Sequence, residues 1–167
     1  MENIIARIFT IASTVIILVV AGALGFHAIQ SSKLNSAQSE ASSIISNVEQ
    51  MYSATLQYGS LTTTTAMSGG IFTPDEIASG APQDPWGGAI TLAGANGTPS
   101  TFTLTFAGIA QDACGQLAAA FNGANILSVA VNGSTVGSPA SGSPVDPGVA
   151  SSSCGAGNTN SVTWTVK

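Results

Sequence analysis

The feature that most constrains this chain is an uncharged, apolar stretch near its beginning. Residues 8–29 read IFTIASTVIILVVAGALGFHAI and contain no Asp, Glu, Lys or Arg. The charge-free window extends from residue 8 to residue 32, between Arg7 and Lys33. A helix of about 20 apolar residues crosses a hydrocarbon core of ~30 Å. The stretch therefore predicts a transmembrane helix, or a helix that is buried among neighbouring proteins.

The residues that follow keep a helical pattern but are apolar on one face only. Apolar or small side chains recur at steps of three and four residues, with Ser, Gln, Asn and Glu between them. The members of this stripe are Leu34, Ala37, Ala41, Ile44, Ile45, Val48, Met51, Tyr52 and Thr55. Such a stripe is typical of a helix that packs on a domain. Because no Pro precedes Pro74, we expect one unbroken helix over about 3–58.

The pattern divides the chain into a long N-terminal helix (1–58) and a globular head domain (59–167). Within the helix, 1–29 is the expected membrane or filament-core segment, and 30–58 is the amphipathic half. The remainder has the usual size of a single domain. His27 closes the apolar stretch, and because the chain has one His we expect it to pack rather than to bind a ligand.

The composition excludes several classes of function. Charged residues are 7% of the chain, against about 25% in an average soluble protein. Three basic residues cannot form a nucleic-acid patch. With one His, two Cys and no phosphate-loop, G-x-S-x-G or dinucleotide motif, the sequence predicts no enzyme and no cofactor or metal site. So few charges suit a surface that is buried against copies of the same chain, and a secreted domain that tolerates a neutral surface is the alternative.

The chain contains two cysteines, Cys114 and Cys154. An isolated pair suits an oxidising compartment and one disulfide, and two free thiols are the alternative. The bridge would close a loop of about forty residues, for which the chain-entropy model gives ~3–4 kcal/mol. We expect the bridge because the enclosed segment, rich in Gly, Ser, Pro and Asn, has little else to hold it.

The head domain is expected to be a small antiparallel sheet with short helices. Strands are predicted over 89–93, 101–107, 125–132 and 161–166, helices over 73–78 and 111–122, and loops over 59–70, 79–88 and 134–160. In the second strand Phe102, Leu104 and Phe106 alternate with threonines and should face a core. The fold class is therefore α+β, with a long N-terminal helix packed on a small antiparallel β-sheet and a disulfide-tied C-terminal loop region.

Three loop features have two interpretations each. Asn96-Gly97 and Asn132-Gly133 predict tight hairpin turns, and each also begins a glycosylation sequon. Trp86 is expected to anchor the loop 79–88, in which a ligand role for Asp84 is the weaker alternative.

This arrangement resembles a mature type IV pilin. Residues 107–117, AGIAQDACGQL, are similar to the region around the first disulfide cysteine of type IVb major pilins, the class of the toxin-coregulated, bundle-forming and conjugative thin pili. Residues 84–87, DPWG, are similar to the loop ahead of the sheet in pilins and pseudopilins. The resemblance implies a structural major subunit of an extracellular pilus, polymerising through its apolar helix into a helical filament of identical subunits.

The resemblance also implies how such a subunit is processed and assembled. A prepilin peptidase would cleave before Met1, the new amine would be methylated, and an assembly machinery would lift the precursor from the inner membrane. The implied assembly residues are Glu2, Arg7, Ile8, Phe9, Val15, Ile16, Leu18 and Val19, with local helix unwinding at Gly22 and Gly25. Pilins usually carry Glu at the fifth position, where this chain has Ile5. We therefore expect Glu2 to pair with Arg7 or with the Met1 amine of a neighbouring subunit, because a buried charge needs a partner.

Two other functions are compatible with the sequence. One is a pseudopilin of a type II secretion system, against which the cysteine pair argues, since the major pseudopilin type normally lacks a C-terminal disulfide. The other is a single-span membrane protein with an external binding domain.

Overall fold

The computed structural model describes residues 30–78 and 80–167. The chain divides into two units, residues 1–33 and 34–167. We call the second the globular unit, and it contains a sheet, short helices and most of the described helical segment 30–52. This α+β architecture, with a disulfide in its C-terminal region, confirms the predicted fold class.

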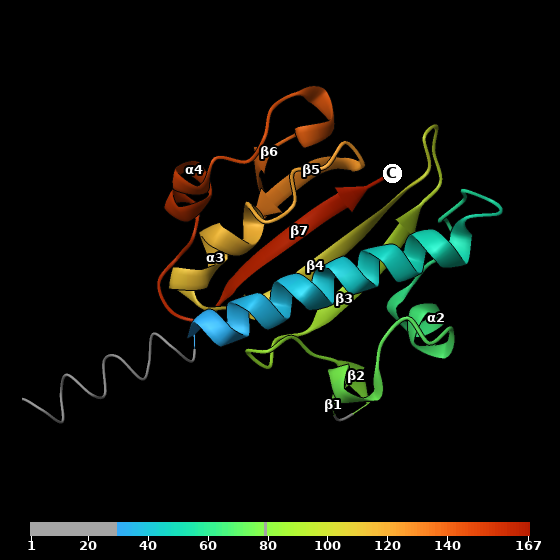
Figure 1. Cartoon of the computed structure of the whole chain (residues 1–167), viewed down its shortest axis with the longest axis horizontal. Helices are drawn as coiled ribbons and strands as arrows, with labels where there is room; N and C mark the ends of the chain where they lie inside the picture. The colour runs from blue at the N-terminus through green and yellow to red at the C-terminus, as the bar shows by residue number, and fades with distance from the viewer. Residues whose placement is uncertain (1–29, 79) are drawn as a thin grey trace, which may run out of the picture. The chain divides into compact units, whose positions relative to one another are not determined.

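Residues 30–52 form the N-terminal helix, and its part within the globular unit lies across one face of the sheet (Figure 1). Its buried side chains are six of the predicted stripe, namely Leu34, Ala37, Ala41, Ile44, Ile45 and Val48. The amphipathic pattern is therefore confirmed over 34–48. Met51 was predicted in the same stripe but is 43% exposed, and Thr55 lies in an exposed turn beyond the helix.

The N-terminal helix ends at residue 52, and the prediction that it reaches Tyr58 is wrong. The next residues form turns, and Leu56 adopts a φ of 50° while its N–H donates to the Tyr52 carbonyl at 2.8 Å. This reversal returns Tyr58 to the core, where it is 3% exposed and its ring centroid lies 4.9 Å from that of Phe102. Its N–H donates to Ser100 Oγ at 2.9 Å. The free energy gained by burying the Tyr58 ring against the sheet exceeds the free energy that further helical turns to residue 58 would contribute.

Five strands form an antiparallel sheet in the order β3–β4–β7–β5–β6. They are β3 (Ile90–Ala95), β4 (Thr101–Ile109), β5 (Ile126–Val131), β6 (Ser134–Gly137) and β7 (Asn160–Val166). The last strand in the sequence, β7, lies between β4 and β5, so the central strand of the sheet is the C-terminal one (Figure 1). A two-residue turn joins β5 to β6, and Asn132 and Gly133 both have positive φ, 50° and 81°. This confirms the predicted Asn-Gly hairpin.

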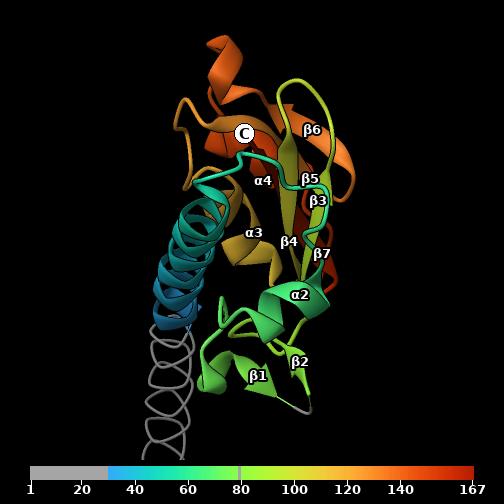
Figure 2. The ribbon, with the colours of Figure 1, turned by 90° about the vertical axis from the view of Figure 1, so that its right-hand side faces the viewer.

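One face of the sheet carries the core, against the N-terminal helix and α3 (Gln111–Ala118) (Figure 2). The fully buried side chains on the two central strands of this face are Phe102, Leu104, Phe106, Val162, Trp164 and Val166. The threonines between them lie on the opposite face, which confirms the predicted alternation. Trp86 packs half-buried against the same core, in agreement with its predicted anchoring role.

Several segments predicted as loops contain regular structure. Helix α2 (Thr63–Ser68) lies within 59–70 and begins with a capping box between Thr62 and Thr65. Strand β6, the 3-10 helix η2 (Pro139–Ser141) and helix α4 (Pro147–Ser152) lie within 134–160. The side chain of Asp146 caps α4 by accepting from the backbone N–H groups of Gly148 and Val149.

Two predicted helices are shorter than expected. The first is a single 3-10 turn, η1 (Pro74–Glu76), after which β1 (Ile77–Ala78) pairs with β2 (Ala81–Pro82). The second, α3, ends at Ala118 rather than at residue 122. The pairing of β1 with β2 ends the first helix, and backbone bonds from the Ala119 N–H to the Gly115 and Leu117 carbonyls close the second.

The outer edge of β3 is covered by the segment that leads into α2. The Gly94 N–H donates to the Leu61 carbonyl at 2.8 Å, and the Leu92 N–H donates to Thr63 Oγ1 at 2.9 Å. A Cβ at position 94 would lie 1.6 Å from the Tyr58 carbonyl oxygen, so this approach requires glycine. Covering the edge satisfies backbone groups that would otherwise be open to pairing with other chains.

Candidate functional site

The predicted processing and assembly residues lie outside the described part of the chain. They are Met1, Glu2, Arg7, Ile8, Phe9, Val15, Ile16, Leu18, Val19, Gly22 and Gly25. Their roles stay predictions, as does the packing role of His27. Among residues 30–78 and 80–167, no helix is both long and apolar enough to cross a membrane.

The predicted disulfide is present between Cys114 and Cys154, with an S–S distance of 2.07 Å and a Cα–Cα distance of 6.2 Å. It connects α3, which lies against the sheet, to the segment that follows α4. The two helices also pack closely, since a Cβ at Gly115 would lie 2.1 Å from Ser151 Oγ. The disulfide and the close packing that Gly115 allows together hold residues 138–157 against the rest of the fold. We call this segment between β6 and β7 the C-terminal excursion.

A buried polar side chain that the sequence did not reveal, Asn160, organises the end of this excursion. It is 1% exposed, and its Nδ2 donates to the carbonyls of Ile109 (3.1 Å) and Gly155 (3.0 Å). Its Oδ1 accepts from the Gly155 N–H at 2.6 Å and from Asn132 Nδ2 at 3.0 Å. Asn is common next to turns, so the sequence did not distinguish Asn160 from an ordinary exposed loop residue. These bonds support the structural interpretation of Asn132 as a turn residue.

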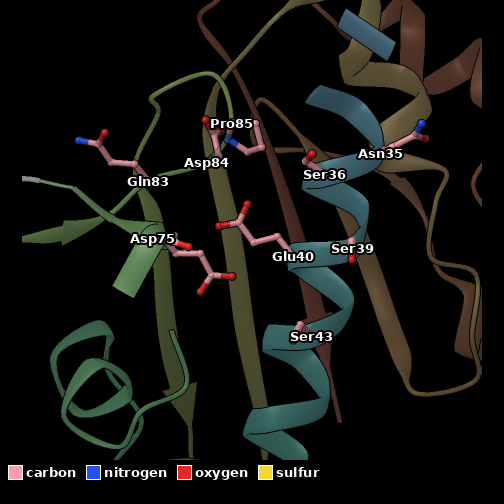
Figure 3. Close-up of a pocket in the computed structure, with 10 residues that line it drawn as sticks. Asn35, Ser36, Ser39, Glu40, Ser43, Asp75, Gln83, Asp84 and Pro85 are labelled. Atoms are coloured by element: carbon pink, nitrogen blue, oxygen red, sulfur yellow. The ribbon is translucent and has the colours of Figure 1, made fainter. Parts of the chain in front are cut away.

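A polar concavity of about 640 Å³ lies between the N-terminal helix and the segment 75–85 (Figure 3). We call it the acidic pocket. Its lining residues are Asn35, Ser36, Ser39, Glu40, Ser43, Asp75, Glu76, Gln83, Asp84 and Pro85. Four of these carry carboxylates, and none of them is basic. No group of three His, Cys, Asp or Glu in the described residues could hold a metal ion. The carboxyl groups of the pocket suit an organic cation or the cationic side chain of a protein.

Asp84, in the DPWG stretch, shapes the wall of the pocket. It is 5% exposed, and its Oδ1 accepts from the backbone N–H groups of Trp86 and Gly88, both at 2.9 Å. Gly88 lies against the sheet, where a Cβ would be 1.5 Å from the Ala107 carbonyl oxygen. The Asp-Pro-Trp-Gly sequence is thus explained by a turn that its own aspartate stabilises, which favours a structural role for Asp84 over the weaker prediction of a ligand.

Glu40 is the unusual carboxylate of the pocket. Its side chain leaves the N-terminal helix and points toward the segment that carries Asp75 and Asp84 (Figure 3). Its Oε1 is buried and has no hydrogen-bond partner. Burial raises its pKa to about 8, and the negative charges of Glu76 and Asp84 add to the shift. Glu40 therefore keeps its proton to a higher pH than an ordinary carboxyl group does.

Replacing Glu40 with Gln is expected to weaken the decline of thermal stability with rising pH. The pKa of Glu40 is raised from 4.5 to about 8 by folding. Between these values the folded state holds a proton that the unfolded state has released, so the free energy of unfolding falls as pH rises through this window. The measurement is the melting temperature of both proteins between pH 5 and pH 9. Asp112→Asn, at an exposed carboxylate on α3, is the control and should keep the wild-type slope. Equal slopes for wild type and Glu40→Gln would contradict the burial of Glu40.

The face of the sheet opposite the core is uncharged and lined with hydroxyls. Thr105 and Thr163 share a hydrogen bond of 2.9 Å across β4 and β7, and Ser128 donates to Thr165 at 3.1 Å. Cross-strand hydroxyl pairs of this kind stabilise a sheet modestly. They also show how a chain with few charges builds a polar surface.

Comparison with known proteins agrees with this architecture. A family model described as PilS N terminal matches residues 31–167. No curated protein matches the sequence. The type IV b pilin from Salmonella typhi is similar in structure, with a TM-score of 0.59 and 22% identity over 78% of this chain and 97% of that one. TcpA, a type IV pilin from the Vibrio cholerae El Tor biotype, has a TM-score of 0.55 and 16% identity, covering 81% of this chain and 99% of that one.

Both structural neighbours are type IV pilins, and the matched family spans the globular unit. A pilin is a structural subunit, which agrees with the expectation that the chain is not an enzyme. The resemblance inferred from AGIAQDACGQL and from the two cysteines is thereby confirmed, and the chain belongs to the PilS N-terminal family and has the type IV pilin fold.

Proposed function

We propose that this chain is the structural major subunit of an extracellular, type IVb-like pilus. It polymerises through its apolar N-terminal segment, 8–29, into a helical filament of identical subunits. The observation that carries the proposal is the match of residues 31–167 to the PilS N-terminal family, in a chain whose residues 8–29 form a charge-free apolar stretch.

Physical chemistry supports polymerisation through this stretch. An apolar helix needs lipid or protein around it, and burial of apolar surface stabilises by about 25 cal/mol per Å². Packing the segments of many copies together replaces lipid with protein. The uncharged hydroxyl face of the sheet, with the Thr105–Thr163 and Ser128–Thr165 pairs, then provides a polar surface without charge repulsion between subunits.

The proposal includes a membrane-bound precursor and a processing pathway. The precursor waits in the inner membrane, a prepilin peptidase cleaves it before Met1, and the pilus assembly machinery lifts the subunit into the filament. Within the filament, Glu2 pairs with Arg7 or with the Met1 amine of a neighbouring subunit, which compensates the cost of burying these charges.

The disulfide favours a pilin over a pseudopilin, and the shearing of cells separates a pilin from the second alternative. A pseudopilin of a type II secretion system is expected to lack the C-terminal bridge that joins Cys114 to Cys154. A single-span membrane protein with an external binding domain would stay in the membrane and would be absent from material sheared from cells.

Negative-stain electron microscopy of sheared cell-surface material, with intact mass on the same fraction, tests the proposal. We expect long thin filaments of one chain that begins at a methylated Met1 and lacks two hydrogens because of the disulfide. Val15→Asp is expected to abolish the filaments, because an unpartnered charge in an apolar filament core costs several kcal/mol. Thr64→Asp adds the same charge at an exposed position in the first turn of α2 and should leave filaments intact. The protein found only in detergent-extracted membranes would instead indicate the membrane-anchored binding domain.

A further inference from the structure

The charges of the globular unit are distributed very unevenly. Of the three basic residues of the chain, Arg7 and Lys33 precede residue 34, so Lys167 is the one basic side chain of this unit. Of the eight acidic residues, only Glu2 precedes residue 34. Four of the remaining seven line the acidic pocket. An exposed cation, Lys167, and a concavity lined by several carboxyl groups thus occur on the same unit.

Lys167 borders an apolar groove of about 430 Å³, which we call the lysine groove. The groove is lined by Leu56, Gln57, Tyr58, Gly97, Thr98, Pro99, Ser100 and Lys167. Leu56 is 64% exposed and is held at a φ of 50° by the bond from its N–H to the Tyr52 carbonyl. A leucine at positive φ raises the conformational free energy of the folded chain, and residues of this kind cluster at functional sites. Together, the apolar side chain and the adjacent ammonium make this a candidate contact surface.

The lysine groove and the acidic pocket lie at opposite ends of the globular unit. The groove is lined by residues 56–58, which follow the N-terminal helix, by residues 97–100 between β3 and β4, and by Lys167 after β7. The pocket is lined by helix residues within 35–43 and by residues within 75–85. Figure 2 shows the C-terminus and the β3–β4 turn at the top of the unit, and β1 and β2 at its bottom. Two different surfaces at opposite ends of a subunit generate a head-to-tail contact. Repetition of such a contact produces an open filament rather than a closed dimer.

We propose that the lysine groove of one copy docks on the acidic pocket of the next copy, with the Lys167 ammonium directed at Asp75. This inference rests on the proposed function and specifies which surfaces of the globular unit meet in the filament. A second copy is the partner because the globular unit carries both the cationic groove and the carboxyl-lined pocket, so each copy offers the complement of the other. Asp75 is exposed at the pocket rim, while the neighbouring Glu76 carboxylate is occupied as the capping partner of the Thr73 N–H. Asp75 is therefore the carboxylate of η1 that is available to a neighbour.

A single exposed ion pair contributes little free energy to an interface. Such pairs nevertheless fix the register in which two subunits meet and disfavour incorrect contacts. The contact proposed here repeats at every subunit, so reversing one charge affects every junction of the filament. Leu56, beside Lys167 in the groove, adds apolar area to the same junction. Reversing the charge of Lys167 or of Asp75 alone is therefore expected to impair filament assembly, and reversing both is expected to be tolerated.

The test compares sheared filaments from cells that produce the full chain with Lys167→Glu, Asp75→Lys or both substitutions. Each single reversal is expected to lower filament yield roughly tenfold, because like charges then face each other at every junction. The double reversal should restore most of the yield. Asp112→Lys has the same charge change as Asp75→Lys on an exposed site of α3, and it should stay near the wild-type yield.

Disulfide crosslinking between introduced cysteines provides a second test of the same contact. Cysteines placed at both Asp75 and Lys167 are expected to give a ladder of disulfide-linked oligomers on oxidation, whereas either cysteine alone gives no more than dimers. Wild-type yield in Lys167→Glu, or absence of the ladder in filaments of the double-cysteine chain, would overturn the docking of these two surfaces while leaving the proposed function intact. Absence of filaments from wild-type cells would overturn the proposed function and the inference with it.

Discussion

Replacing Trp164 with Ala is expected to destabilise the globular unit by about 3–5 kcal/mol. Trp164 is fully buried on β7, the central strand, where it lies opposite Leu104 on one side and Val129 on the other. Its ring meets those of Phe106 and Phe121 edge to face, with centroid distances of 5.7 Å and 5.5 Å. Removing it leaves a cavity in a close-packed core, which the surrounding side chains fill only in part.

Chemical denaturation followed by far-UV circular dichroism measures this effect. Thr163→Ala is the matched control on the same strand, since it removes one hydroxyl from the opposite face and its bond to Thr105. The control is expected to lose about 1 kcal/mol or less. A similar loss in both variants would mean that Trp164 is not central to the packing of this sheet.

Removing the disulfide is the second large effect we expect. Replacing Cys114 and Cys154 together with Ser should lower the free energy of unfolding by about 3–4 kcal/mol, the chain-entropy value for a loop of this length. The bridged cysteines are 40 residues apart, and Cys114 is fully buried against the core. The loss should begin in the excursion 138–157, whose other main attachments are the packing of α4 on α3 and the Asn160 bonds.

Two measurements separate this local effect from global unfolding. The denaturation midpoint reports the total loss, and limited proteolysis should cut the double-Ser protein first within 138–157. Wild type under reducing conditions is the matched control and should behave like the double-Ser protein. A midpoint that reduction leaves unchanged would contradict a stabilising role for the bridge.

Most of the sheet was predictable because its signals are local. The alternation of Phe102, Leu104 and Phe106 with threonines has the period of a strand, and this period alone decides which side chains face the core. The Asn132-Gly133 turn was recognisable because few residues other than Asn and Gly tolerate the positive φ angles it requires. The disulfide was recognisable because a chain with two cysteines offers only one pairing.

The candidate site was less predictable because it joins segments that are far apart in the sequence. Glu40 belongs to the polar part of a helical pattern and reads as a solvated residue. It becomes a buried acid with a raised pKa only because the segment with Glu76 and Asp84 packs against the N-terminal helix. The relation between Lys167 and Asp75 likewise depends on the folded unit, because each residue lines a different concavity.

The sequence by itself determined the class of the protein: an apolar segment at 8–29, an amphipathic helix over 34–48, alternating strands and one disulfide. These follow from side-chain periodicity and residue chemistry, which act over a few neighbouring positions. Only the tertiary structure decided the position of β7 between β4 and β5, and the end of the N-terminal helix at residue 52. Both depend on burial of distant side chains against one another, such as Tyr58 on Phe102, and the free energy of such contacts exceeds the local preferences that a pattern records.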